Sequence, residues 1–248
     1  MLSTVELILK WQDDTKPTPQ LGSVMHGLIM ESIRPDYAEK LHRQSLRPFS
    51  QHLRFDRSLN QTIWTISALT EEAGDELLSA FQPGETVYEL KRRQKRFKIT
   101  GRKELRRESY QAFSDAHILG APPRRQHRLK LLTPTSFKSG GEYMLFPTTK
   151  HIMESLINRW NAFSPVFSIG DASEISQFIG STRISKYHLK STSFSLEGTR
   201  IPSFWGDLTL ETEGPEIRRR ILQLLIDYGQ FSGIGIKTAL GMGGYTLE

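Results

Sequence analysis

The alternation of apolar and polar positions in the first 115 residues predicts an ordered series of strands and helices. Residues 5–11 alternate or run apolar, which is typical of a strand. Apolar residues then recur at helical spacing over 21–33, and a second short helix is expected over 37–44. The remaining predicted elements are strands over 50–55 and 62–69, a helix over 70–81 and a strand that starts at 87. This order, β, α(α), β, β, α, β, is that of a ferredoxin-like fold.

The same order recurs more loosely in the second half of the chain. A segment rich in glycine and proline, 114–126, is the expected boundary between the halves. The elements predicted after it are strands over 129–132 and 143–146, a helix over 152–163, strands over 183–196 and 205–212, a helix that begins at Pro215 and a strand over 245–247. We therefore predict an α+β protein of two tandem ferredoxin-like (RRM-like) domains, residues 1–115 and 124–248.

Composition agrees with a folded protein that works in the cytoplasm. The 248 residues are 37% hydrophobic and include 13 Phe and 4 Trp, enough for one large core or two smaller ones. The chain has no Cys, which excludes disulfides and thiolate metal sites and fits a reducing compartment. No signal peptide and no apolar run of about 18 residues is evident, so a membrane segment is not expected.

The net charge of +6 is concentrated in one segment, 91–107, which has ten cations and one acid in seventeen residues. Such stripes attract the phosphates of nucleic acids, and an aromatic residue among them, here Phe97, can stack on an unpaired base. A solvated charged hairpin is the alternative. We favour RNA contact because so few acids are close in sequence, with these candidate residues: Lys91, Arg92, Arg93, Lys95, Arg96, Lys98, Arg102 and Lys103.

A glycine-rich loop near the C-terminus is the second candidate for phosphate contact. Five glycines occur in the twelve residues 233–244. The segment lacks the Gly before Lys237 that a P-loop requires, and it follows the last helix instead of opening a βαβ unit. Backbone N–H groups of such loops can hold phosphate, although a plain hairpin into a last strand would need the same glycines. The candidate residues are Gly233, Gly235, Lys237, Thr238, Gly241 and Gly243.

Four segments stand out along the chain: Leu21-Gly22-Ser-Val-Met-His26-Gly27, Leu41-His42 with Pro48-Phe49, Thr133-Pro134-Thr135-x-Phe137, and Gly233-Ile-Gly235-x-Lys237-Thr238-Ala-x-Gly241-x-Gly243. Taken together and in this order, they resemble the CRISPR-associated repeat-RNA endoribonucleases of the RAMP superfamily. The resemblance implies two ferredoxin-like domains and cleavage of precursor CRISPR RNA within each repeat, without metal or cofactor, leaving a 2′,3′-cyclic phosphate. The partner it implies is CRISPR repeat RNA, with effector-complex subunits or a second copy of the chain as further candidates.

The resemblance also implies a catalytic role for His42, because family members often carry a catalytic histidine after a leucine at this position. Histidine suits proton transfer because its ordinary pKa is near neutrality. An ordinary helix-end histidine is the alternative. His26 could share the acid and base work, position RNA, or be a partly exposed structural residue. Some members have a tyrosine where this chain has Met30, which cannot transfer protons.

Arg47 stands where the family often has a cation, which would stabilise negative charge on the phosphate; a solvated loop arginine is equally compatible with the sequence. No H-E-x-x-H or D-x-D pattern is present, which disfavours a metal-dependent nuclease. The main rival hypothesis is a non-catalytic RNA-binding subunit of a CRISPR effector complex. An unrelated RNA-binding module is the other.

Overall fold

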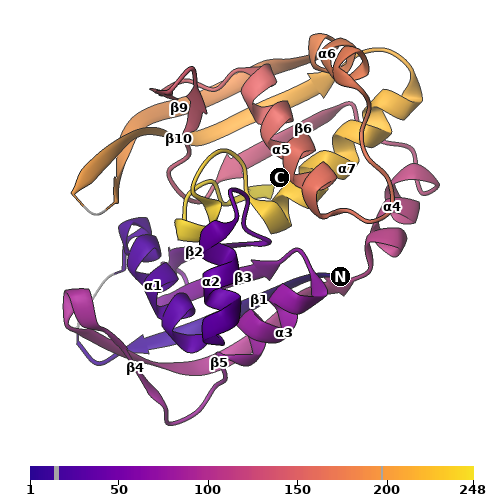
Figure 1. The fold of residues 1–248 in the computed structure, drawn as a ribbon. Helices are drawn as coiled ribbons and strands as arrows, with labels where there is room; N and C mark the ends of the chain where they lie inside the picture. Colours follow the sequence, from indigo (N-terminus) through magenta and orange to yellow (C-terminus); the bar gives the residue numbers. More distant parts are fainter. Residues whose placement is uncertain (14–16, 197) are drawn as a thin grey trace.

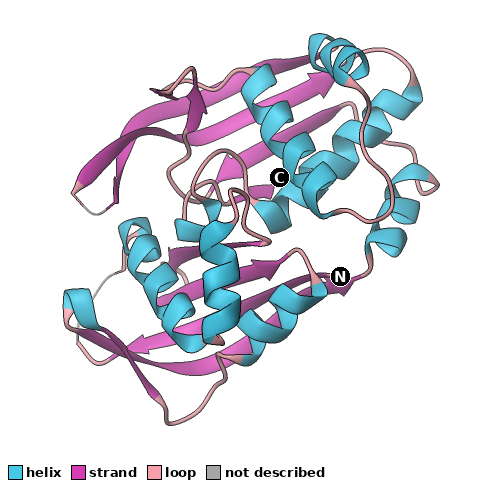
Figure 2. Ribbon diagram, in the orientation of Figure 1, coloured by secondary structure: helices cyan, strands magenta, loops and turns pink. Residues whose placement is uncertain are grey.

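The computed structural model describes residues 1–13, 17–196 and 198–248. The chain forms two α+β halves that lie side by side, the N-terminal half below and the C-terminal half above in Figure 1. Each half is a curled antiparallel sheet covered by helices (Figure 2). None of the helices in the described ranges is long and apolar enough to cross a lipid bilayer.

The N-terminal half has a five-stranded sheet in the order β2-β3-β1-β5-β4, in which all neighbours are antiparallel. Its strands are β1 (Leu2–Trp11), β2 (Phe49–Asp56), β3 (Gln61–Ala68), β4 (Val87–Leu90) and β5 (Lys95–Glu108). Its helices are α1 (Gly22–Ser32), α2 (Pro35–Arg43) and α3 (Glu71–Ser79), with short 3₁₀ turns η1 (Pro19–Leu21) and η2 (Lys91–Arg93). The predicted order of elements is confirmed here.

The C-terminal half repeats this connectivity around a four-stranded sheet in the order β11-β6-β10-β9. Its strands are β6 (Gln126–Leu131), β9 (Thr182–Leu196), β10 (Thr199–Thr212) and β11 (Tyr245–Leu247). Its helices are α5 (Thr149–Phe163), α6 (Ala172–Gly180) and α7 (Glu216–Ser232), with the 3₁₀ turn η3 (Thr238–Leu240). In both sheets the first strand of the unit lies between its third and fourth strands, so the predicted fold of tandem ferredoxin-like units is confirmed.

One local prediction was wrong, and one helix was missed. The strand predicted over 143–146 does not join the four-stranded sheet, because β8 (Glu142–Met144) pairs with β7 (Phe137–Ser139) in a separate hairpin. Helix α6 was not predicted, although Asp171 and Glu174 form a capping box at its start. The expected boundary over 114–126 begins inside α4 (Tyr110–Ile118).

Helix α4 connects the halves and packs on the C-terminal one. Tyr110 and Phe113 are buried in the core that includes Trp160 and Tyr228, and their rings contact Trp160. His117 Nε2 lies 2.7 Å from an Asp227 carboxylate oxygen on α7. Burial lowers the pKa of His117, but the hydrogen bonds to Asp227 and to a backbone carbonyl outweigh it, so the pKa is raised. The connecting helix is thus fixed against α7.

A buried polar network joins the N-terminal sheet to the end of the chain. The indole N–H of Trp64, which is fully buried, donates to Gln51 Oε1 at 2.9 Å. Gln51 Nε2 in turn donates to the carbonyl of Gly22 at 2.7 Å and to that of Ala239 at 3.3 Å. Because buried polar groups need partners, this one side chain fixes β3, the start of α1 and the C-terminal loop relative to one another.

Candidate active site

The glycine-rich loop of the C-terminal half docks on the first turn of α1 in the N-terminal half, as Figure 1 shows for the loop that follows α7. A Cβ on Gly22 would lie 2.5 Å from the Leu240 carbonyl oxygen. A Cβ on Gly241 would lie 2.8 Å from the Gly22 Cα, and Gly241 has a φ of +101° that L side chains rarely adopt. Close approach of the two backbones therefore brings Lys237 to the ends of α1 and α2.

A cleft of about 640 Å³ lies where these segments meet. All three predicted catalytic residues line it, His26 from α1 and His42 and Arg47 from α2 and the turn that follows. It is also lined by four of the residues predicted to bind RNA: Lys91, Arg92, Arg93 and Lys237. Side chains from five separate stretches of sequence therefore converge on one concave, basic surface.

His42 is exposed in the last turn of α2, and the packing of that helix explains why. Tyr37 and Leu41 have 2% and 0% exposure and face the core. On a helix the residue after a buried one points about 100° away, so His42 faces outward into the cleft. An exposed imidazole at the rim of a basic cleft is accessible to a substrate.

His26 does not occupy the partly exposed position expected of it. Its side chain is buried, with 8% exposure, and its ring stacks on Phe49 with centroids 5.9 Å apart and planes 14° apart. Met30, one turn further along α1, also lines the cleft. His26 thus lies in the wall of the cleft, held by an aromatic contact, while His42 lies at its rim.

Arg47 is half-buried beside Pro48, at a wall that the cleft shares with a second cavity. Burial lowers the pKa of its guanidinium. Its Nε is buried and has no hydrogen-bond partner within the part of the chain that the structure describes. Such a group has hydrogen-bonding capacity left for a ligand oxygen.

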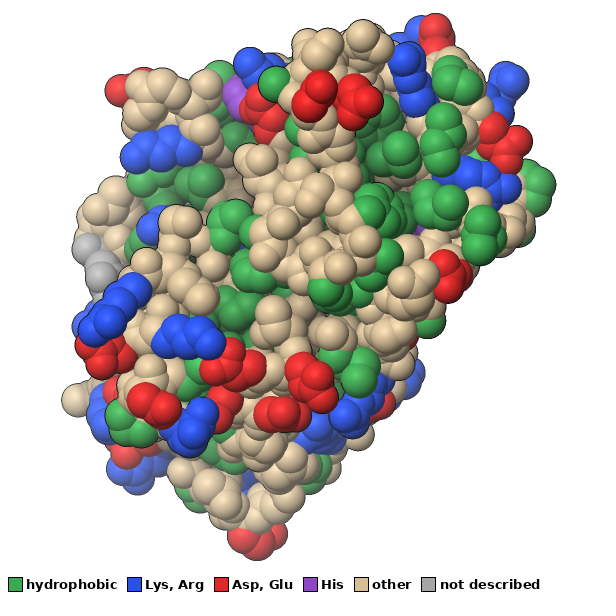
Figure 3. All heavy atoms as spheres, turned by 45° about the vertical axis from the view of Figure 1, so that its right-hand side comes forward, with side chains coloured by type: hydrophobic (Ala, Val, Ile, Leu, Met, Phe, Trp, Pro, Cys, Tyr) green, Lys and Arg blue, Asp and Glu red, His purple; other side chains and the backbone are tan. Residues whose placement is uncertain are grey.

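The basic segment does not form one continuous stripe. Lys91 forms an ion pair with Glu31 at 2.8 Å, and Arg96 forms one with Glu89 at 3.3 Å. Other cations are paired with Asp13 and Glu85 or, for Arg102, donate to the carbonyls of Leu78 and Phe81. The argument that too few acids are available was wrong, because the acids come from outside the segment. In Figure 3 basic and acidic side chains are interspersed over the lower, N-terminal half.

Phe97 cannot stack on a base. It is fully buried, with its ring centroid 5.1 Å from that of Trp11 and 5.5 Å from that of Tyr88. The strand alternation that buries both Phe97 and Ile99 places the intervening Lys98 outward. The predicted base-stacking role for Phe97 is therefore wrong.

The glycines of the loop have a structural role instead of the expected phosphate contact. The amides of Gly233, Gly235, Gly241 and Gly243 donate to protein acceptors, namely Gly229 O, Ser155 Oγ, Thr238 O and Pro134 O. A Cβ would lie 2.2 Å from the Ser136 carbonyl oxygen at Gly235 and 1.9 Å from that of Ile234 at Gly243. Thr238 is buried as well, with 2% exposure. The prediction that these amides hold phosphate is wrong, whereas Lys237 is exposed in the cleft.

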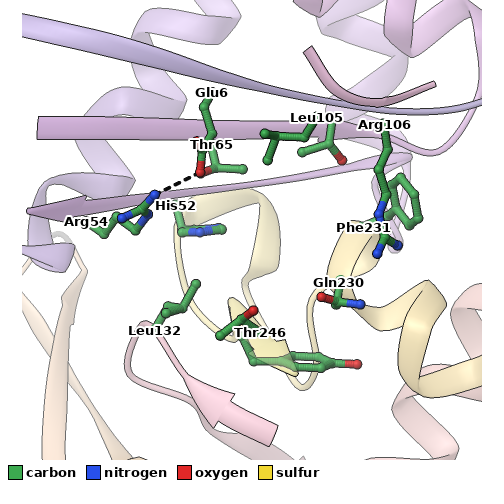
Figure 4. A pocket seen from close by; sticks show the side chains of 12 residues that line it. Glu6, His52, Arg54, Thr65, Leu105, Arg106, Leu132, Gln230, Phe231 and Thr246 are labelled. Atoms are coloured by element: carbon green, nitrogen blue, oxygen red, sulfur yellow. Dashed lines mark hydrogen bonds and ion pairs between the residues drawn. The ribbon is translucent and has the colours of Figure 1, made fainter. Parts of the chain in front are cut away.

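A further pocket of about 130 Å³ lies between the two halves, between β2 and the C-terminal strand (Figure 4). Its Arg54 is paired with Glu6 at 3.0 Å. Burial, and to a smaller extent the charge of Arg54, lowers the pKa of His52 to about 4, so this imidazole is neutral at neutral pH. None of the predicted site residues lines this pocket, and its ion pair and neutral histidine are those of a packed interface.

Known proteins identify the family. The family model for "CRISPR-associated endoribonuclease Cas6" matches residues 129–245. A protein of that name from Mycobacterium tuberculosis is 32% identical over 235 residues, which cover 92% of this chain and 72% of the relative. Another from Streptococcus thermophilus is 25% identical over 247 residues, which cover 98% of each chain.

Solved structures share the fold at lower identity. A Cas6 product complex aligns over 100% of this chain and 99% of its own with a TM-score of 0.81 and 20% identity. Thermus thermophilus Cas6 aligns over 100% and 98% with a TM-score of 0.76, also at 20% identity. The expected family and the expected class of enzyme, an endoribonuclease, are both confirmed. On the sequence relationship to the mycobacterial protein, the chain belongs to the Cas6 family of CRISPR-associated endoribonucleases.

Proposed function

We propose that the protein cleaves precursor CRISPR RNA within its repeats, in the cleft that His42 borders, by a metal-independent reaction. The ribose 2′-oxygen at the cut site bonds to the adjacent phosphorus while the bond from phosphorus to the 5′-oxygen breaks. The 2′-hydroxyl gives its proton to a base, and the leaving 5′-oxygen takes a proton from an acid. The products are a 2′,3′-cyclic phosphate and a 5′-hydroxyl.

One observation carries this proposal: an exposed histidine and a half-buried, incompletely bonded arginine line the same basic cleft. His42 supplies an imidazole, which can accept or donate a proton. Arg47 and Lys237 supply positive charge for the phosphate as negative charge develops on it. The names of the relatives and of the solved Cas6 product and substrate mimic complexes support the same activity.

The remaining lining residues have supporting roles in this proposal. The cations of η2, Lys91, Arg92 and Arg93, hold the RNA backbone on one side of the cleft. His26 lies in the wall of the cleft. There it either positions the ribose or carries out one of the two proton transfers while His42 carries out the other. The RNA partner and a cytoplasmic location belong to the same proposal, as does delivery of the product to effector-complex subunits.

The test is single-turnover cleavage of the cognate repeat RNA by purified protein in EDTA. The RNA is compared with one that carries 2′-deoxyribose at the cut site. We expect wild type to cut once, the deoxy RNA to resist, and His42→Ala to bind with unchanged affinity but to lose cleavage. His188→Ala, an exposed histidine of β9 outside the cleft, is the matched control and should cut at the wild-type rate.

Two outcomes would contradict the proposal. Tight RNA binding by wild type with no cleavage would favour the non-catalytic effector subunit. Cleavage that EDTA abolishes and that His42→Ala retains would favour a metal-dependent nuclease. His26→Ala, assayed beside His42→Ala, shows whether the buried histidine takes part in the chemistry or only in binding.

A further inference from the structure

A second cavity, of about 310 Å³, adjoins the cleft on the side of the C-terminal half. The cleft and this cavity share Arg47, Lys237 and Leu240 as lining residues. Lys138 of β7 and Arg159 of α5 line the cavity as well, so four cations surround it. No Asp or Glu is among the described residues that line it. The sequence-based prediction included neither Lys138 nor Arg159.

Arg159 is the unusual residue of this cavity. Its side chain has 5% exposure, and its one bonded guanidinium nitrogen donates to the Gly235 carbonyl at 3.1 Å. Its Nε is buried without a hydrogen-bond partner, and no carboxylate in the described ranges forms an ion pair with it. Burial lowers its pKa to about 10, which still leaves it charged at neutral pH. A buried charge without a counter-charge is costly, so an anion at this position would stabilise it.

A second arginine reaches the same cavity from the other half of the molecule. Arg47 Nε is also buried and also lacks a partner among the described residues. Lys138 is exposed at the edge of the cavity, with its ammonium 5.7 Å from the centroid of the Tyr143 ring. Two guanidinium groups with spare donors, beside two exposed ammonium groups, match the acceptor oxygens of a phosphate.

We propose that this cavity binds a phosphate group of the RNA strand that neighbours the scissile phosphate, with Arg159 and Arg47 as its buried donors. Because Arg47 and Lys237 line both the cleft and the cavity, an RNA strand that lies in the cleft continues into the cavity. Its volume is at the lower end of the roughly 300–1,000 Å³ typical of ligand pockets, which suits one nucleotide. The identity of the ligand as RNA rests on the proposed function, whereas the preference for phosphate rests on the cations alone.

The test measures binding, not cleavage, in a protein that carries His42→Ala. A set of repeat RNAs each carries one neutral methylphosphonate linkage next to a deoxyribose, at successive positions on either side of the cut. The same RNAs with an ordinary phosphate beside the deoxyribose are the controls. We expect one position beside the scissile phosphate at which neutralisation weakens binding by about tenfold, as loss of a charged hydrogen bond would.

The same scan with Lys138→Ala and with Arg159→Met should show a smaller effect of neutralisation at that position and unchanged effects elsewhere. Lys138 is exposed, so Lys138→Ala should fold and still test the proposal if Arg159→Met does not fold. Circular dichroism shows whether Arg159→Met is folded. Lys150→Ala, exposed on the same helix as Arg159 but outside the cavity, is the matched control.

A scan without any sensitive position, or one in which both variants weaken all RNAs equally, would overturn the proposal. A final arm adds inorganic phosphate without RNA and follows thermal unfolding. A second contrary result is that phosphate raises the midpoint of wild type but not of Arg159→Met, while no RNA position in the scan is sensitive to neutralisation. That result would assign the cavity to free phosphate and would also overturn the proposal. Because affinity is measured, the result does not depend on whether His42 is catalytic.

Discussion

Gly22 and Gly241 pack backbone against backbone, with the Gly22 Cα only 2.8 Å from the place where a Cβ on Gly241 would lie. The first of these residues starts α1 in the N-terminal half, and the second ends η3 in the C-terminal loop. Their contact brings Lys237 into the cleft that His26 and His42 line. The candidate active site is therefore built by both halves together.

Gly241→Ala should displace the loop from α1. The methyl group would clash with Gly22, and the positive φ alone should cost about 1–3 kcal/mol. We expect a lower midpoint in urea unfolding and slower cleavage. Gly180→Ala, at a glycine with open space around it at the end of α6, is the control and should neither lower the midpoint nor slow cleavage. An unchanged midpoint for Gly241→Ala would show that the loop adapts without cost.

Arg47→Ala should slow the chemical step more than it weakens binding. Loss of one preorganised donor to a developing negative charge typically lowers the rate by about 10²–10³. Single-turnover rates at saturating protein separate this effect from affinity. Arg47→Lys, which keeps the charge but not the guanidinium, should recover part of the rate. Equal losses in rate and affinity would instead indicate a ground-state contact only.

Lys237→Ala should make RNA binding less dependent on salt. Each phosphate contact that is lost should reduce the slope of log K against log salt by about 0.7–0.9, the values for single strands and for duplex DNA. Lys98→Ala is the control, because Lys98 is paired with Glu85 outside the cleft. We expect the slope of the control to match wild type. A larger change of the salt slope for Lys98→Ala than for Lys237→Ala would indicate that the RNA lies on the β4–β5 hairpin instead of in the cleft.

Acid should destabilise the protein in part through His52. Its pKa of about 4 in the folded state is below the ordinary value of 6.5, so the unfolded state binds a proton first as the pH falls. The resulting loss begins near pH 6.5 and ends near pH 4, and it totals on the order of 3 kcal/mol. Unfolding free energies at several pH values for wild type and His52→Asn should show a flatter profile in the variant. If the unfolding free energies of wild type and His52→Asn fell in parallel with pH, His52 would not be the group responsible for the loss.

The order of elements could be predicted because apolar spacing is a local property. The helical spacing of 21–33 and the alternation of β1 survive in the structure, and so does the βαββαβ order of each half. Burial of Phe97 could also have been predicted, since Ile99 lies two residues further on and faces the same way. The aromatic residue was assigned to the surface because of the charges around it.

Tertiary contacts could not be predicted in this way. Glu31 and Asp13, the partners of Lys91 and Lys95, are distant in sequence and approach the basic segment only in the folded protein. Glu85 and Glu89 lie just before the segment and pair with Lys98 and Arg96 across the β4–β5 hairpin. The docking of the glycine loop on Gly22 likewise joins two segments that the family resemblance had linked only by their order. Arg159 did carry a signal, because it is a charged residue one turn from Leu156 on the buried face of α5.

The contact between Gly22 and Gly241 also restricts how the protein can vary during evolution. In most packed pairs, enlargement of one residue can be compensated by a smaller residue at the other position. Neither partner can become smaller here, because both are already glycine. A search for second-site suppressors of a change at either position should therefore return none at its partner. We expect suppressors only where they let the whole loop move, such as in the segment that joins α7 to η3.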